Sequence, residues 1–385
     1  MQKLKDIKQK ILPVLEGGEV LIIVPPFVSI IDIALGPHTL QALAEEKGHK
    51  ISILYLNMLL ASIIGVEHYE EICNAPLYQM LGERLFARSA YGLSPLGNNP
   101  GCCTDEAMSI RSSEPHQKMF FDTPLPFDLD KYLQLERICQ YFLDEVITVI
   151  TSLDYKIIGC STFMTGQINC SIALLNGVKQ NHPGTITIIG GPNCKGEMSE
   201  GIASLSHAID FIFSGESETT FLDFLEAYSL KKFPSQRIIK GEPLADLDSL
   251  PLPGYEIFSQ QYGHFLGKSS FQRIKIWYET SRGCWWGQKS RCTFCSEDRL
   301  TYTVKSINKV VSDLERINKI YPGNMIYIAD NIMPHSYQHD LLPVISQRKE
   351  FPSLAYHLKV NYNLQNLVQL KKARIRAILP GIETF

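Results

Sequence analysis

Three cysteines in the last third of the chain constrain its fold most strongly, because a strand-forming run leads directly into them. Cys284, Cys292 and Cys295 have the spacing C-x7-C-x2-C, and the residues before them, 274–278, are mostly apolar and β-prone. A strand that delivers three thiolates into a loop with glycine and aromatic residues suits a metal cluster. A structural zinc site usually closes with four ligands, whereas an iron–sulfur cluster held by three cysteines keeps one iron open for another ligand.

Two other interpretations fit the spacing alone. The cysteines could be ordinary packing residues, or they could form a zinc loop with a distant fourth ligand. A disulfide framework is not expected in this long chain, because the other seven cysteines show no regular spacing. Those seven are Cys73, Cys102, Cys103, Cys139, Cys160, Cys170 and Cys194.

The cysteine segment resembles the cluster loop of cobalamin-dependent radical SAM enzymes. The matching sequence is ETSRGCWWG at 279–287 and CTFC at 292–295. Most radical SAM proteins use C-x3-C-x2-C, and the longer first spacing with a double tryptophan is similar to radical SAM C-methyltransferases that mature ribosomally made peptides. The resemblance implies that Cys284, Cys292 and Cys295 hold three irons of a [4Fe–4S] cluster and that S-adenosyl-L-methionine (SAM) binds the fourth.

Length and composition indicate a soluble protein of two domains. The chain has 385 residues, of which 45% are hydrophobic and 20% charged, with a formal net charge of -3. These values are ordinary for a globular protein and give no electrostatic indication of a nucleic-acid or membrane partner. The most apolar run, at 20–36, is interrupted by prolines and Asp32 and falls short of the ~20 residues that cross a bilayer. We expect a cytoplasmic protein.

Residues 1–239 predict a doubly wound α/β domain, because buried apolar strands alternate with amphipathic helices. Such an open parallel sheet binds ligands at the carboxyl ends of its strands. A mostly helical or irregular insertion is expected at 57–150. Strands are predicted at 19–24, 51–56, 156–161, 185–189 and 211–213, and helices at 1–15, 37–47, 130–152, 167–181, 197–205 and 217–228.

Three loops at successive strand ends of this domain resemble those that surround cobalamin in the same enzymes. On its own, a glycine pair such as 190–191 is more typical of an ordinary tight turn, and it is the three loops together that favour cobalamin. Cobalamin domains that coordinate cobalt through histidine carry D-x-H-x-x-G after the first strand, but the loop at 25–32 has no histidine, so we expect none on the lower face of the corrin. The resemblance implies cobalamin contacts at Ser161, Thr162, Gly190, Gly191, Gly215 and Glu216.

The sequence after residue 239 predicts a linker followed by an incomplete barrel. Residues 240–272 form the linker, and the density of Pro, Asp and Gly at 240–258 indicates extended chain. Residues 273–385 predict the first four β/α units of a TIM-like barrel, with function at the strand carboxyl ends. Its later strands are expected at 324–329, 354–361 and 375–383, separated by helices at 306–320, 337–348 and 363–371.

Polar residues at these strand ends match positions that hold SAM in the family. The element PGIET at 380–384 is similar to the family's P-G-I-E-S, whereas Ser296-Glu297-Asp298-Arg299 stands where the family usually has Gly-Leu-Asn-Gly. The family's barrel has six strands, so a chain ending after the fourth is expected to be a fragment. The resemblance implies SAM contacts at Asp330, Asn331, Lys359, Asn361 and Glu383.

The function implied by the resemblance is a cobalamin-dependent radical SAM methyltransferase acting on an unactivated carbon of a ribosomally synthesised peptide. Its cofactors would be a [4Fe–4S] cluster, SAM and cobalamin. Its partners would be a precursor peptide and a reductant protein of the flavodoxin or ferredoxin type. The residues assign no general base, and three alternatives stay open: another radical reaction, a truncated fragment that binds cofactor or peptide without turnover, and a zinc-stabilised interaction protein.

Overall fold

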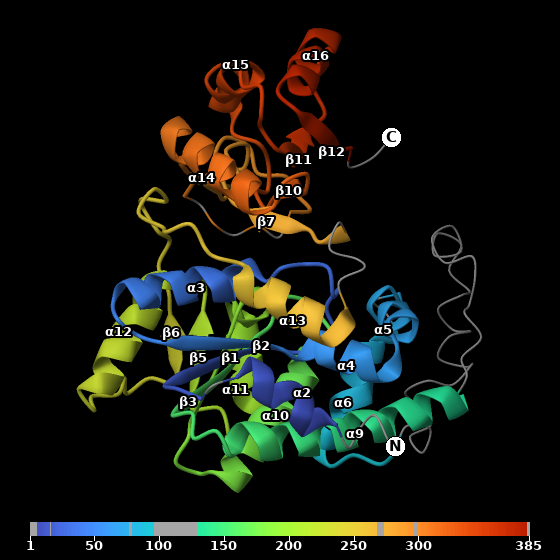
Figure 1. Cartoon of the computed structure of the whole chain (residues 1–385). Helices are drawn as coiled ribbons and strands as arrows, with labels where there is room; N and C mark the ends of the chain where they lie inside the picture. The colour runs from blue at the N-terminus through green and yellow to red at the C-terminus, as the bar shows by residue number, and fades with distance from the viewer. Residues whose placement is uncertain are drawn as a thin grey trace.

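Two α/β units follow one another along the chain, and the second, orange to red, lies above the first in Figure 1. The computed structural model describes residues 6–15, 17–76, 79–95, 129–267, 273–295, 297, 299 and 301–382. None of the described helices is long and apolar enough to cross a membrane.

The first unit is built on a six-stranded sheet in the order β2-β1-β3-β4-β5-β6, with every neighbouring pair parallel. The chain winds to one side from β1 to β2 and to the other side from β3 onwards, so β1 and β3 flank the topological switch point. The strands are β1 Val20–Val24, β2 Ile51–Tyr55, β3 Ile157–Ser161, β4 Ile186–Gly190, β5 Phe211–Ser214 and β6 Ile238–Lys240. All of these strands except β6 were predicted from the sequence.

The period-two alternation of each strand divides the core between the two faces of this sheet. Val20 and Ile22 of β1 pack with α3 and α12, whereas Leu21 and Ile23 belong to the larger core that includes α9 and α10. Both faces are therefore covered, as in other parallel sheets. The helices around the sheet are α2 Ile7–Ile11, η1 Leu12–Val14, α3 Leu35–Glu46, α10 Ile168–Asn181, η3 Pro192–Cys194, α11 Glu197–Leu205 and α12 Glu218–Ser229.

The helical insertion is anchored to the sheet by a buried carboxylate. Glu83 accepts hydrogen bonds from the backbone amides of Gly166 (2.8 Å), Ile168 (3.0 Å) and Asn169 (2.7 Å) at the start of α10. A negative charge is stabilised at a helix N-terminus, so Glu83 fixes the insertion near the switch point. The helices of the insertion are α4 Leu56–Ile64, α5 Val66–Cys73, α6 Leu81–Tyr91 and α9 Leu129–Thr151.

The connection between the units is only partly extended. Residues 241–255 contain no helix or strand, but α13 (Glu256–Leu266) follows and packs beside α4 (Figure 1). Gln261 of α13 donates to the carbonyl of Ile53 at 2.6 Å and accepts from the amide of Tyr55 at 2.9 Å. The side chain therefore satisfies backbone groups at the outer edge of β2. The helix was not expected, because the Pro, Asp and Gly content of 240–258 predicted extended chain there.

The second unit is an open parallel sheet in the order β12-β11-β10-β7. Each strand lies beside the next one along the chain, as in the opening part of a barrel. A short antiparallel pair, β8 with β9, stands beside it. The elements are β7 Ile276–Tyr278, β8 Ser281–Arg282, β9 Thr303–Val304, α14 Ile307–Ile320, β10 Met325–Ile328, η5 His335–Gln338, α15 Leu341–Ser346, β11 Ser353–Lys359, α16 Leu364–Lys372 and β12 Ile375–Gly381. The predicted fold, a doubly wound sheet followed by the first four strands of a barrel, is confirmed.

Candidate functional site

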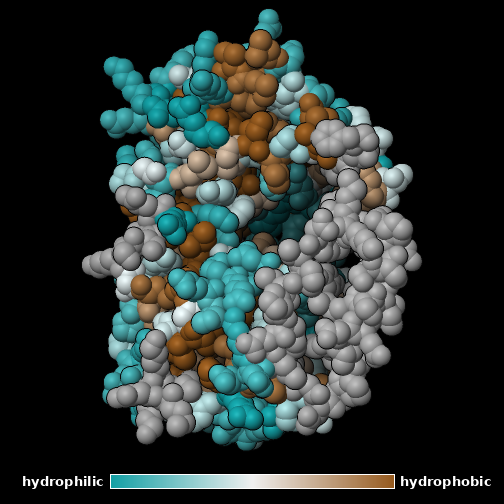
Figure 2. Space-filling model, turned by 90° about the vertical axis from the view of Figure 1, so that its right-hand side faces the viewer, coloured by the Kyte–Doolittle hydropathy of each residue, from teal (hydrophilic) through white to brown (hydrophobic). Residues whose placement is uncertain are grey.

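A polar cleft lies where the carboxyl ends of the two sheets meet. The first unit contributes Lys195, after β4, and Glu216, after β5, and the second contributes the corners after β7 and β10. Figure 2 shows a hollow with hydrophilic surface between the two units. The cleft residues of the second unit are Glu279, Ser281, Arg282, Gly283, Glu297, Arg299, Ala329 and Asn331.

The cysteine segment starts at this cleft. Pairing of Ser281 and Arg282 with β9 closes the base of the loop. Gly283 follows with φ +80°, and a Cβ there would lie 2.5 Å from the carbonyl oxygen of Thr301. Only glycine fits both the backbone angle and the space. The loop therefore leaves β8 along a path that the residue before Cys284 determines.

The three thiols have the donor chemistry of a cluster site. The amide of Gly287 donates to Sγ of Cys284 at 3.3 Å, and the amide of Glu297 donates to Sγ of Cys295 at 3.4 Å. Cys284 and Cys292 are half-buried and Cys295 is exposed. Backbone amides directed at sulfur stabilise thiolates and tune iron–sulfur clusters. Over the described part of the chain, no group of three or more His, Cys, Asp and Glu side chains is arranged to hold a metal ion, so the ligand roles of the cysteines stay predictions.

The double tryptophan joins the cysteine loop to the ends of β10 and β11. Nε1 of Trp285 donates to the carbonyl of Met333 at 3.0 Å, and its ring lies 5.3 Å from that of His335. The ammonium of Lys359 lies 2.8 Å from the ring centroid of Trp286 and 5.8 Å from that of Trp285. Cation–π attraction therefore orients the loop, and Lys359, predicted to contact SAM, is in contact with the cysteine segment.

Asp330 is buried beneath the same loop. Its carboxylate accepts from the amide of Thr280 (2.7 Å), the hydroxyl of Thr280 (2.5 Å) and the hydroxyl of Ser281 (2.6 Å). Burial raises the pKa of Asp330 to about 6, against the opposing effect of these hydrogen bonds. Asp330 thus fixes the corner between β7 and β8. A direct contact with SAM stays a prediction.

The other predicted SAM residues differ in their surroundings. Asn331 is exposed at the cleft and donates to Oε2 of Glu297 at 2.7 Å. Asn361 is exposed after β11, and Glu383 lies outside the described residues. Nη1 of Arg299 is buried in the cleft wall without an acceptor among the described residues. The cleft therefore keeps one buried donor for a polar ligand.

On the first unit, the predicted cobalamin loops pack tightly against one another. Gly191 has φ +108°, and a Cβ there would lie 2.5 Å from the carbonyl oxygen of Thr162. Thr162 donates its amide to the carbonyl of Gly190 at 2.8 Å. These contacts explain the glycine pair by loop packing alone. Next to Ser161 and Thr162, however, Phe163 and Met164 are 55% and 44% exposed, which provides apolar surface that a flat macrocycle can cover.

The loop after β1 is docked on the second unit. Asp32 accepts from Nε1 of Trp277 at 2.9 Å and pairs with Nζ of Lys275 at 3.3 Å. His38, the histidine nearest to this loop in the sequence, lies in the core, with Nε2 2.9 Å from the hydroxyl of Tyr55, and burial lowers the pKa of its imidazole to about 4. His38 is therefore neutral near pH 7.

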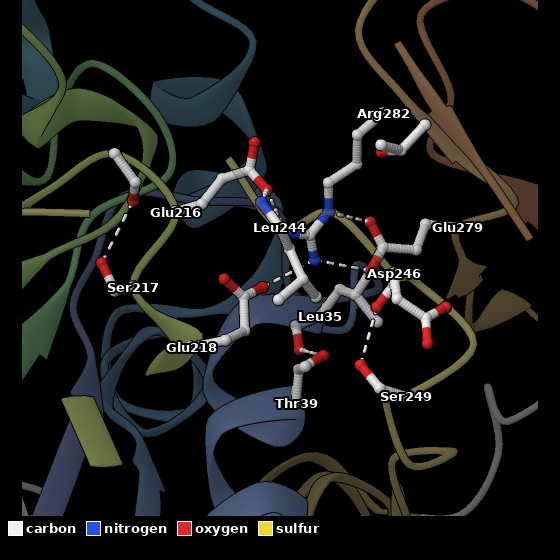
Figure 3. Close-up of polar contacts among 12 residues, drawn as sticks. Leu35, Thr39, Glu216, Ser217, Glu218, Leu244, Asp246, Ser249, Glu279 and Arg282 are labelled. Atoms are coloured by element: carbon white, nitrogen blue, oxygen red, sulfur yellow. Dashed lines mark hydrogen bonds and ion pairs between the residues drawn. The ribbon is translucent and has the colours of Figure 1, made fainter. Parts of the chain in front are cut away.

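Sequence reasoning missed a cluster of buried charges that joins the units. Arg282 bonds to both carboxylate oxygens of Glu279, each at 2.7 Å, to Glu216 at 2.8 Å and to Glu218 at 2.6 Å (Figure 3). Burial alone would raise the pKa of Glu279, but the hydrogen bonds and charge of Arg282 lower it. Burial alone would lower the pKa of Arg282, but the hydrogen bonds and charges of Glu279 and Glu218 outweigh burial and raise it. The signal for this cluster in the sequence is Arg282, an arginine two residues before Cys284.

Comparisons with known proteins give a match in structure alone. No family model matches the sequence, and no curated protein matches it. Two solved structures of the radical SAM methyltransferase TsrM from Kitasatospora setae match with a TM-score of 0.53 and 12% identity over 95% of this chain. One has a tryptophan substrate and the SAM analogue aza-SAM bound, and the other has cobalamin and a [4Fe–4S] cluster bound. The match covers 59% and 61% of those chains, so this chain spans about three fifths of their length. Over nearly its whole length, the chain is similar in fold to a radical SAM methyltransferase.

Proposed function

We propose that this protein is a cobalamin-dependent radical SAM methyltransferase. The observation that carries the proposal is the position of the cysteine loop: it starts at the cleft where the carboxyl ends of both sheets meet. The fold shared with TsrM supports the same assignment. In α/β enzymes, those ends are where ligands bind.

The residues proposed to bind the cofactors lie in both units. Cys284, Cys292 and Cys295 would hold the cluster, and Asp330, Asn331, Lys359, Asn361 and Glu383 would contact SAM. The loops with Ser161, Thr162, Gly190, Gly191, Gly215 and Glu216 would surround cobalamin. When bound, the cluster with SAM supplies a carbon-centred radical that removes a hydrogen atom, and cobalamin carries the methyl group.

The side chains around the cleft would position these groups and exclude water. Trp285 and Trp286 belong to the loop that carries the thiols, and their contacts with Met333 and Lys359 limit its movement. Asp330 keeps the corner between β7 and β8 in place through Thr280 and Ser281. This positioning is the part of radical catalysis that a protein supplies itself.

The substrate we propose is a ribosomally synthesised peptide, which is methylated at an unactivated carbon. The electron donor we propose is a flavodoxin or ferredoxin. The resemblance of ETSRGCWWG to the peptide-maturing C-methyltransferases supports this class. Free tryptophan is a second candidate, because one matched structure of TsrM has tryptophan bound as substrate.

The test uses anaerobically reconstituted protein with SAM, cobalamin and a chemical reductant. Formation of 5′-deoxyadenosine together with transfer of label from methyl-labelled SAM to a peptide is the expected result. Label transfer to tryptophan without 5′-deoxyadenosine would overturn the peptide C-methylation proposal. Cobalamin binding without 5′-deoxyadenosine or methyl transfer would indicate a binding protein, and 5′-deoxyadenosine without methyl transfer would indicate another radical reaction.

A further inference from the structure

Both ends of the cysteine loop are bound by one carboxylate of the other unit. Arg282 lies two residues before Cys284, and Arg299 lies four residues after Cys295. Nη1 of Arg282 is 2.8 Å from Oε2 of Glu216, and Nε of Arg299 is 2.9 Å from Oε1 of the same side chain. Glu216 therefore spans the base of the loop from its position after β5.

Burial makes these bonds stronger than ordinary surface ion pairs. The side chains of Arg282, Arg299 and Glu216 are 16%, 6% and 20% exposed. Screening by water and salt is reduced at such exposure, and charge-assisted hydrogen bonds are the strongest class in proteins. Glu218 and Glu279 add two further carboxylates around Arg282 (Figure 3).

The backbone around Glu216 is itself held in place by the connection between the units. The amide of Leu244 donates to Oε2 of Glu216 at 3.0 Å. A Cβ on Gly241 would lie 1.7 Å from the carbonyl oxygen of Glu216, so only glycine lets the connection pass there. Nη2 of Arg299 also donates to the carbonyl of Leu244 at 3.3 Å. The first unit, the connection and the cysteine loop thus meet at one side chain.

We propose that Glu216, through Arg282 and Arg299, is a positioning residue that holds the cysteine loop in a fixed place against the first unit. This assigns the carboxylate of Glu216 to the arginines, so that cobalamin contacts at this loop come from its neighbours. A further consequence rests on the proposed function: Glu216 sets the separation between the cluster and the cobalamin site.

The first experiment needs no cofactor. Hydrogen–deuterium exchange is measured on the purified chain for peptides within 284–295, in the wild type, Glu216→Gln, Arg282→Lys and Glu200→Gln. Glutamine keeps the size of Glu216 but removes its charge, and lysine cannot bind several carboxylates as the arginine fork does. Glu200 is exposed on α11 and serves as the control for loss of one negative charge.

Exchange in 284–295 should accelerate about tenfold in Glu216→Gln and in Arg282→Lys, because charge-assisted bonds that oppose local opening are lost. Combining the two changes should add less than the sum of their separate effects, because both act on one contact. Exchange in α9 should stay unchanged, which excludes general unfolding. Unchanged exchange at 284–295 in both single variants would overturn the proposal.

The second experiment uses reconstituted protein with cob(II)alamin and follows the relaxation of the reduced-cluster EPR signal, which depends on the distance between the two paramagnetic centres. Glu216→Gln should keep the iron content of the wild type but change this relaxation, as Arg282→Lys should. A loss of cobalamin affinity in Glu216→Gln alone would identify a direct cofactor contact and contradict the positioning role. A wild-type protein without a cluster signal would defeat the proposed function, and the exchange experiment would still decide the role of Glu216.

Discussion

Thr280 donates both its amide and its hydroxyl to the carboxylate of Asp330, at 2.7 Å and 2.5 Å. Thr280 lies between β7 and β8, where the chain leads into the cysteine loop, and Asp330 follows β10. The pair therefore connects two adjacent strands of the second unit at the place where the loop begins.

The stability contributed by Asp330 should increase as the pH falls. Burial raises its pKa to about 6 in the folded protein, above the ordinary aspartate value of 3.8. The folded state thus binds a proton at pH values where the unfolded chain does not, so the contribution is complete below pH ~4 and lost as the pH rises through ~6. Compared with Asp330→Asn, the wild type should gain about 1.4 kcal/mol in unfolding free energy between pH 7.5 and pH 5.0. Denaturant unfolding at both pH values measures this change, and a constant difference would contradict it.

Gly283→Ala should destabilise the second unit more than Gly323→Ala. Both glycines have positive φ, +80° and +82°, so both substitutions introduce a backbone cost of about 1–2 kcal/mol. Only at Gly283 would the new Cβ meet a backbone atom, the Thr301 oxygen at 2.5 Å, whereas no heavy atom lies within 4 Å at Gly323. Thermal unfolding of the two variants isolates the collision, and equal losses would show that the loop path is not constrained at Gly283.

Lys359→Met should loosen the double tryptophan. Methionine keeps an unbranched apolar side chain but removes the ammonium next to the ring of Trp286, where cation–π attraction contributes about 0.5–2 kcal/mol. Acrylamide should then quench the tryptophan fluorescence more effectively than in the wild type. Lys349→Met, at an exposed position before β11, is the matched control and should leave quenching unchanged. Identical quenching in both variants would mean that Lys359 does not hold the loop.

Gln261→Leu should lower the unfolding free energy of the first unit by about 2–4 kcal/mol. The change leaves the Ile53 carbonyl and the Tyr55 amide without their partners at the edge of β2, and an unsatisfied buried group costs about 1–3 kcal/mol. Gln260→Leu, at the exposed neighbouring position, should change stability by less than about 0.5 kcal/mol. A loss below 1 kcal/mol in Gln261→Leu would show that α13 does not stabilise this edge.

The fold could be predicted from the sequence wherever the hydrophobic pattern determines the secondary structure. The apolar run at 20–24 predicted β1, because a strand buried on both faces leaves a continuous apolar signal. Strands β8 and β9 have two residues each and no such pattern. Helix α13 was hidden by the Pro and Asp content of the segment before it.

The candidate site could be predicted from the sequence only in part, because some of its contacts join residues that are far apart in the chain. The spacing of Cys284, Cys292 and Cys295 can be recognised within one short segment. The contact between Glu216 and Arg282 joins residues 66 positions apart, and nothing in either segment indicates its partner. A polar residue at a strand end, such as Asp330, has the same sequence signal whether it binds a ligand or its own backbone. That distinction requires the three-dimensional structure.

The most direct test of the account is the EPR spectrum of anaerobically reconstituted, dithionite-reduced protein with and without SAM. The wild type and Cys73→Ala, which removes a thiol on α5 outside the loop, should both give a reduced-cluster signal that changes when SAM is added. Cys284→Ala, Cys292→Ala and Cys295→Ala should each lose the signal. A protein with one zinc ion and no cluster signal, or loop variants whose signal matches the wild type, would contradict the account.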